Sequence, residues 1–141
     1  MYIVVDFDGT VVTHDFPRIG KDIGSIPVLK RLAAEGHKLI VFTMRSAFVN
    51  KKKETEDTLA PAVQWFKDNG IPLYGIQKNP TQWSWTASPK AYGQLIIDDA
   101  ALGCPLSYDP TKSDRPFVNW SMVEAMLESQ GVLTVKKEEN V

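Results

Sequence analysis

The sequence predicts an α/β fold, a three-layer α/β/α sandwich built around a central, mostly parallel sheet. Three apolar runs without polar alternation indicate strands that are buried on both faces; they lie at residues 2–5, 38–43 and 94–97. Segments with apolar residues at helical spacing separate these runs, and the links between them are short. Such alternation of strand and helix is typical of a parallel sheet that is covered on both faces.

Local signals place the first helix and the elements that follow it. Ser25 is expected to cap a helix that has Pro27 in its first turn and ends at Gly36. Residues 53–69 are expected to form a second helix. Residues 71–76 are expected to form a short strand, placed early or at an edge because proline cannot donate to a ladder.

The last third of the chain contains one more clear helix signal. Asn119 can cap a helix that runs through Gln130 and ends at Gly131. The apolar run at 132–135 is a candidate strand, and the charged tail at 136–141 is expected to fray. Residues 1–135 are therefore expected to form a single domain.

Composition excludes several classes of function. The chain has 141 residues, of which 43% are hydrophobic and 23% charged, and these values are ordinary for a globular protein. Its net charge is −1, so nothing in the composition indicates binding to nucleic acid or to an anionic membrane. Cys104 is the single cysteine, so no intrachain disulfide can form. With no signal peptide visible and no apolar run of ~20 residues, a cytoplasmic protein is expected.

Polar residues follow each of the three apolar runs, and they differ in kind. Asp6 and Asp8 follow the first run, Thr43 closes the second, and Asp98 and Asp99 follow the third. The carboxyl ends of parallel strands meet at one edge of a sheet, which is where open α/β sheets bind ligands. A lysine, Lys90, precedes the third run and could reach the same edge. Carboxylates, a hydroxyl and an ammonium together suit Mg²⁺ and a phosphoryl group.

These residues resemble four motifs of the haloacid dehalogenase-like superfamily, in the same order along the chain. The segment Asp6-Phe7-Asp8-Gly9-Thr10-Val11 resembles the first motif and Thr43 the second. Lys90 resembles the third, with Lys78 as a rival, and Asp98-Asp99 resembles the fourth. The resemblance covers residues 1–99 and implies a magnesium-dependent phosphatase with a Rossmann-like fold.

The resemblance also implies a role for each matching residue. Asp6 would be the nucleophile that forms an aspartyl-phosphate, and Asp8 would act first as general acid and then as general base. Thr43 and Lys90 would bind the phosphoryl oxygens. Magnesium would be held by the Asp6 carboxylate, the Asp8 carbonyl and Asp98, with Asp99 binding directly or through water.

The spacing of the motifs leaves no room for a cap domain, since 34 residues separate Asp8 from Thr43 and 46 separate Thr43 from Lys90. The chain is therefore similar to the capless branch, whose members often close the site with a partner subunit or a large substrate. The substrate is expected to be a phosphorylated small molecule or macromolecule, and the protein a candidate homo-oligomer. The alternative is a non-catalytic module that resembles either this superfamily or the receiver domains of signalling proteins. Such a module would bind phosphate or metal and act as an interaction or signalling domain.

Three further features each allow a functional and a plainer explanation. Arg45 could contact the substrate or be a solvated arginine on the surface. His14 and Asp15 are interpreted as a surface turn, with a substrate contact as the alternative. The run Lys51-Lys52-Lys53 is interpreted as a solvated face before a helix, with steering of an anionic substrate as the alternative.

Overall fold

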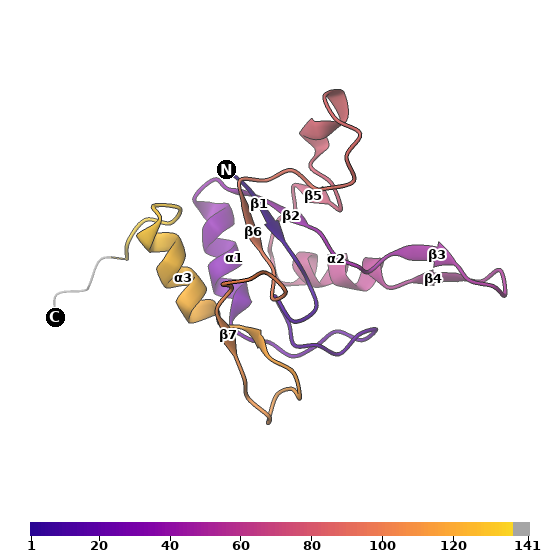
Figure 1. Cartoon of the computed structure of the whole chain (residues 1–141), viewed down its shortest axis with the longest axis horizontal. Helices are drawn as coiled ribbons and strands as arrows, with labels where there is room; N and C mark the ends of the chain where they lie inside the picture. The colour runs from indigo at the N-terminus through magenta and orange to yellow at the C-terminus, as the bar shows by residue number, and fades with distance from the viewer. Residues whose placement is uncertain (137–141) are drawn as a thin grey trace.

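The computed structural model describes residues 1–136 and contains three α-helices, eight short strands and one 3-10 helix (Figure 1). Apart from Lys136, the tail predicted at 136–141 lies outside the described residues. The elements in chain order are β1 (Tyr2–Val5), α1 (Ser25–Ala34), β2 (Lys38–Val41), β3 (Ala47–Val49), β4 (Thr55–Asp57), α2 (Leu59–Asp68), β5 (Gly75–Ile76), η1 (Pro80–Ser84), β6 (Leu95–Ile97), β7 (Leu106–Ser107), β8 (Phe117–Val118) and α3 (Trp120–Ser129).

A four-stranded parallel sheet forms the centre of the fold, in the order β5-β2-β1-β6. Strand β1 lies between β2 and β6, and Val5 is in register with both Val41 and Ile97. The α/β class and the parallel pairing of the strands are thus confirmed. Because the registers match, the residues that follow these three strands emerge at one edge of the sheet.

The main core lies on one face of the sheet. Odd-numbered residues of the first two strands point there and pack with buried residues of all three helices, among them Leu29 of α1, Phe66 of α2 and Leu127 of α3. On the opposite face, Val4 and Ile40 pack with Ala91 from the loop before β6. In residues 1–136 no helix contributes to this second cluster, so a three-layer sandwich is not confirmed.

The helix predictions at 25–36 and 119–130 agree closely with the structure. In α3 the Asn119 side chain accepts a hydrogen bond from the Met122 N–H, as expected of an N-cap. In α1 the predicted cap is wrong: Ser25 is the first helical residue, and its hydroxyl donates to the carbonyl of Val11. Gly24, with a φ of 89°, occupies the cap position instead.

Three other boundaries differ from expectation. Helix α2 begins at Leu59, six residues later than expected, and the residues before it form β4. These residues include Glu56 and Asp57 and offer no apolar face that a helix could bury. The Asp57 side chain accepts the N–H groups of Leu59 and Ala60 at the start of the helix. The strand expected at 71–76 is reduced to Gly75–Ile76. No strand forms at 132–135; this segment packs irregularly on the core, with Leu133 buried.

The link between β2 and α2 forms a two-stranded antiparallel hairpin, β3–β4, that projects away from the body (Figure 1). A second small hairpin, β7–β8, precedes α3, and the N–H of Val118 donates to the carbonyl of Gly9. None of the helices within residues 1–136 is long and apolar enough to cross a membrane.

Candidate functional site

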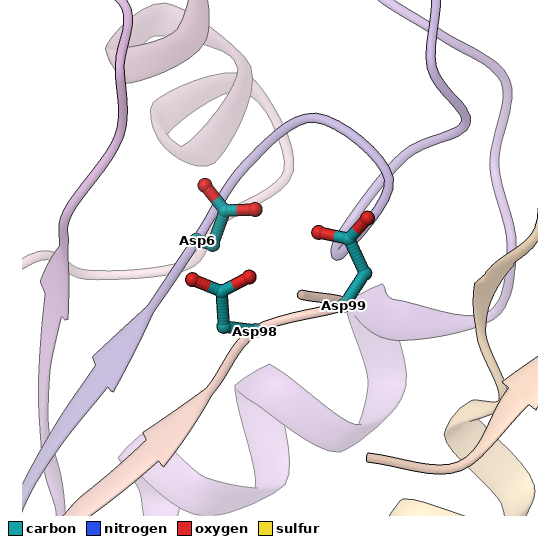
Figure 2. A group of neighbouring side chains, drawn as sticks. All are labelled: Asp6, Asp98 and Asp99. Atoms are coloured by element: carbon teal, nitrogen blue, oxygen red, sulfur yellow. The ribbon is translucent and has the colours of Figure 1, made fainter. Parts of the chain in front are cut away.

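Three carboxylates meet at the carboxyl edge of the sheet, where β1 and β6 end. Asp6 follows β1, and Asp98 and Asp99 follow β6; one oxygen from each lies within 4.8 Å of the others (Figure 2). The strand pairing continues to this point, since the N–H of Asp6 donates to the carbonyl of Ile97 at 3.0 Å. The predicted meeting of the first and fourth motifs is therefore present.

Burial raises the pKa of Asp6 from 3.8 to about 7. Hydrogen bonds from the Phe7 N–H and the Thr10 hydroxyl oppose this rise, whereas the neighbouring carboxyl groups of Asp98 and Asp99 add to it. In residues 1–136 no lysine or arginine forms an ion pair with any of the three carboxylates. Three acidic groups so close together and so little neutralised are a suitable donor set for a hard divalent cation.

The buried hydroxyl of Thr10 links two of the carboxylates. Its Oγ1 lies 2.9 Å from Oδ2 of Asp6 and 3.1 Å from Oδ1 of Asp99, and it accepts the N–H of Asp99 at 3.0 Å. The carbonyl of Thr10 accepts the indole N–H of Trp120 at 2.7 Å. Thr10 therefore fixes the spacing between Asp6 and Asp99, and Trp120 of α3 holds Thr10 in place.

His14 lies inside the site and not on a surface turn. Its Nε2 is 2.9 Å from Oδ2 of Asp99, and both side chains are 16% exposed. Both oxygens of Asp99 are thus engaged, one by His14 and one by Thr10. Asp98 differs, because the N–H of Ala100 donates to its Oδ1 and, in the described residues, no hydrogen bond reaches its Oδ2.

Asp8 is held by Arg45, whose side chain is 0% exposed. The guanidinium donates from Nε to Oδ2 at 2.8 Å and from Nη2 to Oδ1 at 2.7 Å. Its remaining N–H groups donate to the carbonyls of Pro17, Arg18 and Thr58. All five donors of Arg45 are used within the chain, so neither the substrate contact nor the solvated arginine considered for Arg45 agrees with this structure.

Thr43 is partly buried just beyond β2, and Gln77 fixes its backbone. The Gln77 side-chain carbonyl accepts the N–H of Thr43 at 2.8 Å, and its amide donates to the carbonyls of Thr43 and Arg45. The Thr43 hydroxyl accepts the N–H of Arg45 at 3.1 Å. The proton of this hydroxyl can therefore be donated to a ligand.

The two lysine candidates for the third motif do not contact the carboxylates. Lys90 is exposed in the loop before β6, and its backbone carbonyl accepts a hydrogen bond from Gln82. Lys78 lies with its Nζ 4.3 Å from the centre of the Trp83 ring. The structure thus brings Asp6, Asp98 and Asp99 together and does not add either lysine to them.

Comparison with known proteins places the chain in a family without naming an activity. No protein-family model matches the chain, and no curated protein matches it. Among solved structures, it is similar to a conserved protein from Bacteroides thetaiotaomicron, with 30% sequence identity, a TM-score of 0.68, and coverage of 92% of this chain and 91% of that chain. The two chains belong to one family. The name of that protein states no activity, so an account of function depends on the residues themselves.

Sequence reasoning assigned no role in the site to Thr10 or Gln77, and it favoured a surface turn for His14. Thr10 lies within the first motif, and its hydroxyl next to paired carboxylates was an available signal. His14 is five residues beyond Gly9, and only the fold of the intervening loop brings it to Asp99. Gln77 is one of two non-glycine residues with positive φ in residues 1–136, which no local pattern indicates.

Proposed function

We propose that this protein is a magnesium-dependent phosphohydrolase that cleaves a phosphomonoester through an aspartyl-phosphate on Asp6. The observation that carries the proposal is the carboxylate cluster at the end of β1 and β6, with Asp8 two residues beyond the nucleophile candidate. Paired acids at the carboxyl edge of a parallel sheet suit phosphoryl transfer, because charge there must be both supplied and neutralised.

In the first half-reaction, an oxygen of Asp6 attacks phosphorus and the bond from phosphorus to the ester oxygen breaks. Asp8, protonated for this step, gives its proton to the leaving oxygen, and the alcohol departs. In the second half-reaction, water attacks the aspartyl-phosphate while Asp8 takes a proton from that water. The Asp6 carboxylate is regenerated and inorganic phosphate is released, so each group returns to its starting form.

Arg45 sets the starting position of Asp8 in this scheme. Both Asp8 oxygens accept from the buried guanidinium, so Asp8 must give up one of these bonds before that oxygen can carry a proton to the leaving group. Arg45 also joins Asp8 to the carbonyls of Pro17 and Arg18, which belong to the loop after β1. A substrate that moves this loop would therefore also release Asp8.

The same site offers ligands for the phosphoryl oxygens and for the cation. The Thr43 hydroxyl can donate to a phosphoryl oxygen, and Lys90 remains the expected ammonium, with Lys78 as its rival. Magnesium would be held by Asp6, Asp98 and the Asp8 carbonyl, with Asp99 binding directly or through water. When bound, the cation supplies charge neutralisation that lets an anionic nucleophile approach an anionic phosphate.

We also propose that the fold is a reduced form of the capless, Rossmann-like sandwich of the haloacid dehalogenase-like superfamily. The loop between β5 and β6 takes the place of a helix layer on the second face, where it contributes Ala91 to the small cluster. The single cysteine fits a reducing compartment such as the cytoplasm. Substrates expected for such a site are phosphorylated small molecules or macromolecules.

The proposal is tested by phosphatase assays on the purified chain with a generic phosphate ester and Mg²⁺. Asp6→Asn should reduce turnover by several orders of magnitude, since it removes the nucleophile and keeps the side-chain shape. Asp114→Asn is the matched control, because Asp114 is an exposed carboxylate in the link between β7 and β8 and does not belong to the carboxylate cluster. Turnover by Asp6→Asn at the rate of the unmodified chain would refute the mechanism. A panel of sugar phosphates, nucleotides and a phosphopeptide then addresses the substrate.

A second candidate function is a non-catalytic module that binds phosphate or metal. It is favoured by two contacts: both oxygens of Asp8 are occupied by Arg45, and no lysine reaches the carboxylates in residues 1–136. Calorimetry distinguishes the two functions. Binding of Mg²⁺ that depends on Asp98, without turnover of any ester in the panel, would favour the binding module.

A further inference from the structure

The hairpin between β2 and α2, here called the arm (residues 46–58), is an exposed ribbon of two strands. All six residues of β3 and β4 are exposed on both faces, and the arm projects from the edge of the sheet that holds the carboxylates (Figure 1). An isolated two-stranded ribbon is marginally stable in water, and each of its open edges can pair with another strand. The arm therefore has the form of a contact element.

The hydrogen bonds within the arm show which backbone groups of β3 remain unused. Asn50 donates its N–H to the carbonyl of Glu54, and Thr58 donates to the carbonyl of Ser46. Because pairing alternates along an antiparallel ladder, the N–H and C=O groups of Ala47 and Val49 point to the outer edge. Strand β3 thus offers four outward backbone groups in a row with Phe48 between them.

The two edges of the arm differ in charge. Strand β3 is Ala47-Phe48-Val49, with Phe48 48% and Val49 65% exposed, whereas β4 contains Glu56 and Asp57. Two β4 edges placed side by side would bring like charges together, which is unfavourable across an antiparallel pair. Two β3 edges have no such repulsion and bury apolar side chains.

We propose that two copies of this chain pair through β3, antiparallel, with a two-fold axis at Phe48. In this register Ala47 faces the partner's Val49, and Val49 faces the partner's Ala47, so the outward groups of both residues exchange hydrogen bonds. Phe48 faces the partner's Phe48 as a non-hydrogen-bonded pair, in which the two Cα atoms lie closer together than in a hydrogen-bonded pair. A register centred on another residue would satisfy fewer of these groups.

The register has a consequence for the catalytic edge. Counting outward from Phe48, the partner's Asn50 faces Ser46, and the chain then turns, because the N–H of Lys53 donates to the carbonyl of Asn50. The partner's turn at residues 51–53 therefore lies next to the base of the arm, where residues 43–45 lead back into the body. That stretch of the partner is Lys51-Lys52-Lys53, and all three lysines are exposed. The stretch beside it contains Thr43 and Arg45, and Arg45 is bonded to Asp8. Each arm therefore carries its basic tip to the base of the other copy's arm, next to the segment that joins that arm to Thr43 and Arg45.

Charge complements this arrangement. The site holds four carboxyl groups, on Asp6, Asp8, Asp98 and Asp99, against one guanidinium, and no lysine of the same copy contacts the carboxylate cluster in residues 1–136. The partner's lysines would attract a phosphorylated substrate and screen its charge. This last step rests on the proposed phosphatase function, whereas the pairing of the arms does not.

A pair of proline variants tests the pairing by sedimentation. Val49→Pro removes an outward N–H from β3 and leaves the bonds between β3 and β4 in place. Thr55→Pro does the same to the outer edge of β4, because Thr55 faces Val49 across the arm. The unmodified chain and Thr55→Pro should sediment as dimers and Val49→Pro as a monomer. A monomeric unmodified chain, or dimers lost only in Thr55→Pro, would overturn the proposal.

Disulfide trapping tests the register directly, in a Cys104→Ser background that has no other cysteine. Phe48→Cys should form a covalent dimer under mild oxidation, because facing residues of this pair type lie within disulfide range. Ala47→Cys alone should not, since it faces Val49, but a mixture of Ala47→Cys and Val49→Cys should. Trapping by Ala47→Cys alone, with none by Phe48→Cys, would overturn the register.

Mixing two inactive variants tests the role of the lysine tip. Asp6→Asn lacks the nucleophile and keeps its lysines, whereas the triple Lys51→Ala, Lys52→Ala, Lys53→Ala variant keeps the nucleophile and lacks the tip. A mixed dimer contains one complete site, so mixing should raise turnover well above that of either variant alone. Mixing without any gain, in chains that dimerise and trap as expected, would overturn the lysine role. An inactive unmodified chain that still dimerises would refute the phosphatase function alone.

Discussion

Gly9 and His14 are in direct contact: a Cβ atom at position 9 would lie 2.0 Å from Nε2 of His14, the nitrogen that bonds Asp99. Gly9 also has a φ of 78°, which side chains other than glycine's rarely adopt. The absence of a side chain at Gly9 therefore allows the histidine ring to reach the carboxylate cluster. A residue with any side chain would push the ring away from Asp99.

Gly9→Ala should accordingly lower stability by about 2–4 kcal/mol, from the left-handed backbone and the clash with His14. Gly36→Ala is the matched control, because Gly36 has a φ of 91° and a methyl group added there would meet no atom within 4 Å. It should cost about 1 kcal/mol. Urea denaturation of both variants measures the difference, and equal losses would show that the His14 contact carries no weight.

Stability of the metal-free protein should depend on pH through Asp6. Its pKa is about 7 in the folded chain against an ordinary 3.8, so the folded state keeps a proton that the unfolded chain releases first. The resulting stability is present in full below about pH 4 and is lost as pH rises through about 7. Asp6→Asn should remove this dependence and be more stable than the unmodified chain at pH 8, by about 2 kcal/mol.

Denaturant titrations with a chelator present, run from pH 4 to pH 8, provide the measurement for Asp6. Both proteins should be similar at the acid end, where Asp6 is protonated in either state. A stability difference that stays constant across this range would show that the Asp6 carboxyl is not the group responsible.

Arg45→Met should strongly destabilise the fold, by about 3–5 kcal/mol, because it leaves the Asp8 carboxylate and three carbonyl groups without donors. Arg18→Met is the matched control, since Arg18 makes an exposed ion pair with Asp15 and should change stability by less than about 0.5 kcal/mol. Thermal melts of the two variants suffice. Similar melting temperatures for the two variants would mean that the buried ion pair between Arg45 and Asp8 does not stabilise the fold.

Magnesium should raise the melting temperature, because the cation binds the folded carboxylate cluster and not the dispersed unfolded one. Asp98→Asn should abolish most of this shift, whereas Asp114→Asn should keep it. Excess chelator should return the unmodified chain to its metal-free melting temperature. A shift that survives in Asp98→Asn would place the cation elsewhere.

The sequence allowed the sheet to be predicted better than its surroundings. Apolar runs such as Val4-Val5 and Leu39-Val41 are signals of buried strands, and both lie where expected. The arm was missed because each of its strands has only three residues and buries none of them, and because β4 is charged, so no periodic pattern indicates them. The one-sided placement of the helices was also missed, since helical spacing indicates an apolar face but not which side of the sheet it covers.

The residues of the candidate site also differ in how well the sequence predicts their positions. Asp6, Asp98 and Asp99 could be predicted to meet because they directly follow paired strands. The contact between Arg45 and Asp8 depends on the course of two loops, which strand patterns do not encode. Lys90 was assigned to the site from its position in the order of the motifs, and this order alone does not bring a side chain to the carboxyl edge of the sheet.

Gln77 extends the hydrogen-bonding pattern of the sheet beyond the last residue of β5. Its side-chain amide imitates a peptide group: it accepts from Thr43 and donates back to the carbonyl of the same residue, as a neighbouring strand would. Glutamate at this position would keep the acceptor and lose the donor, and methionine would lose both. The Gln77 side chain thus takes the place of a backbone peptide group. Position 77 therefore requires both a donor and an acceptor, as a strand residue does, although no strand is present there.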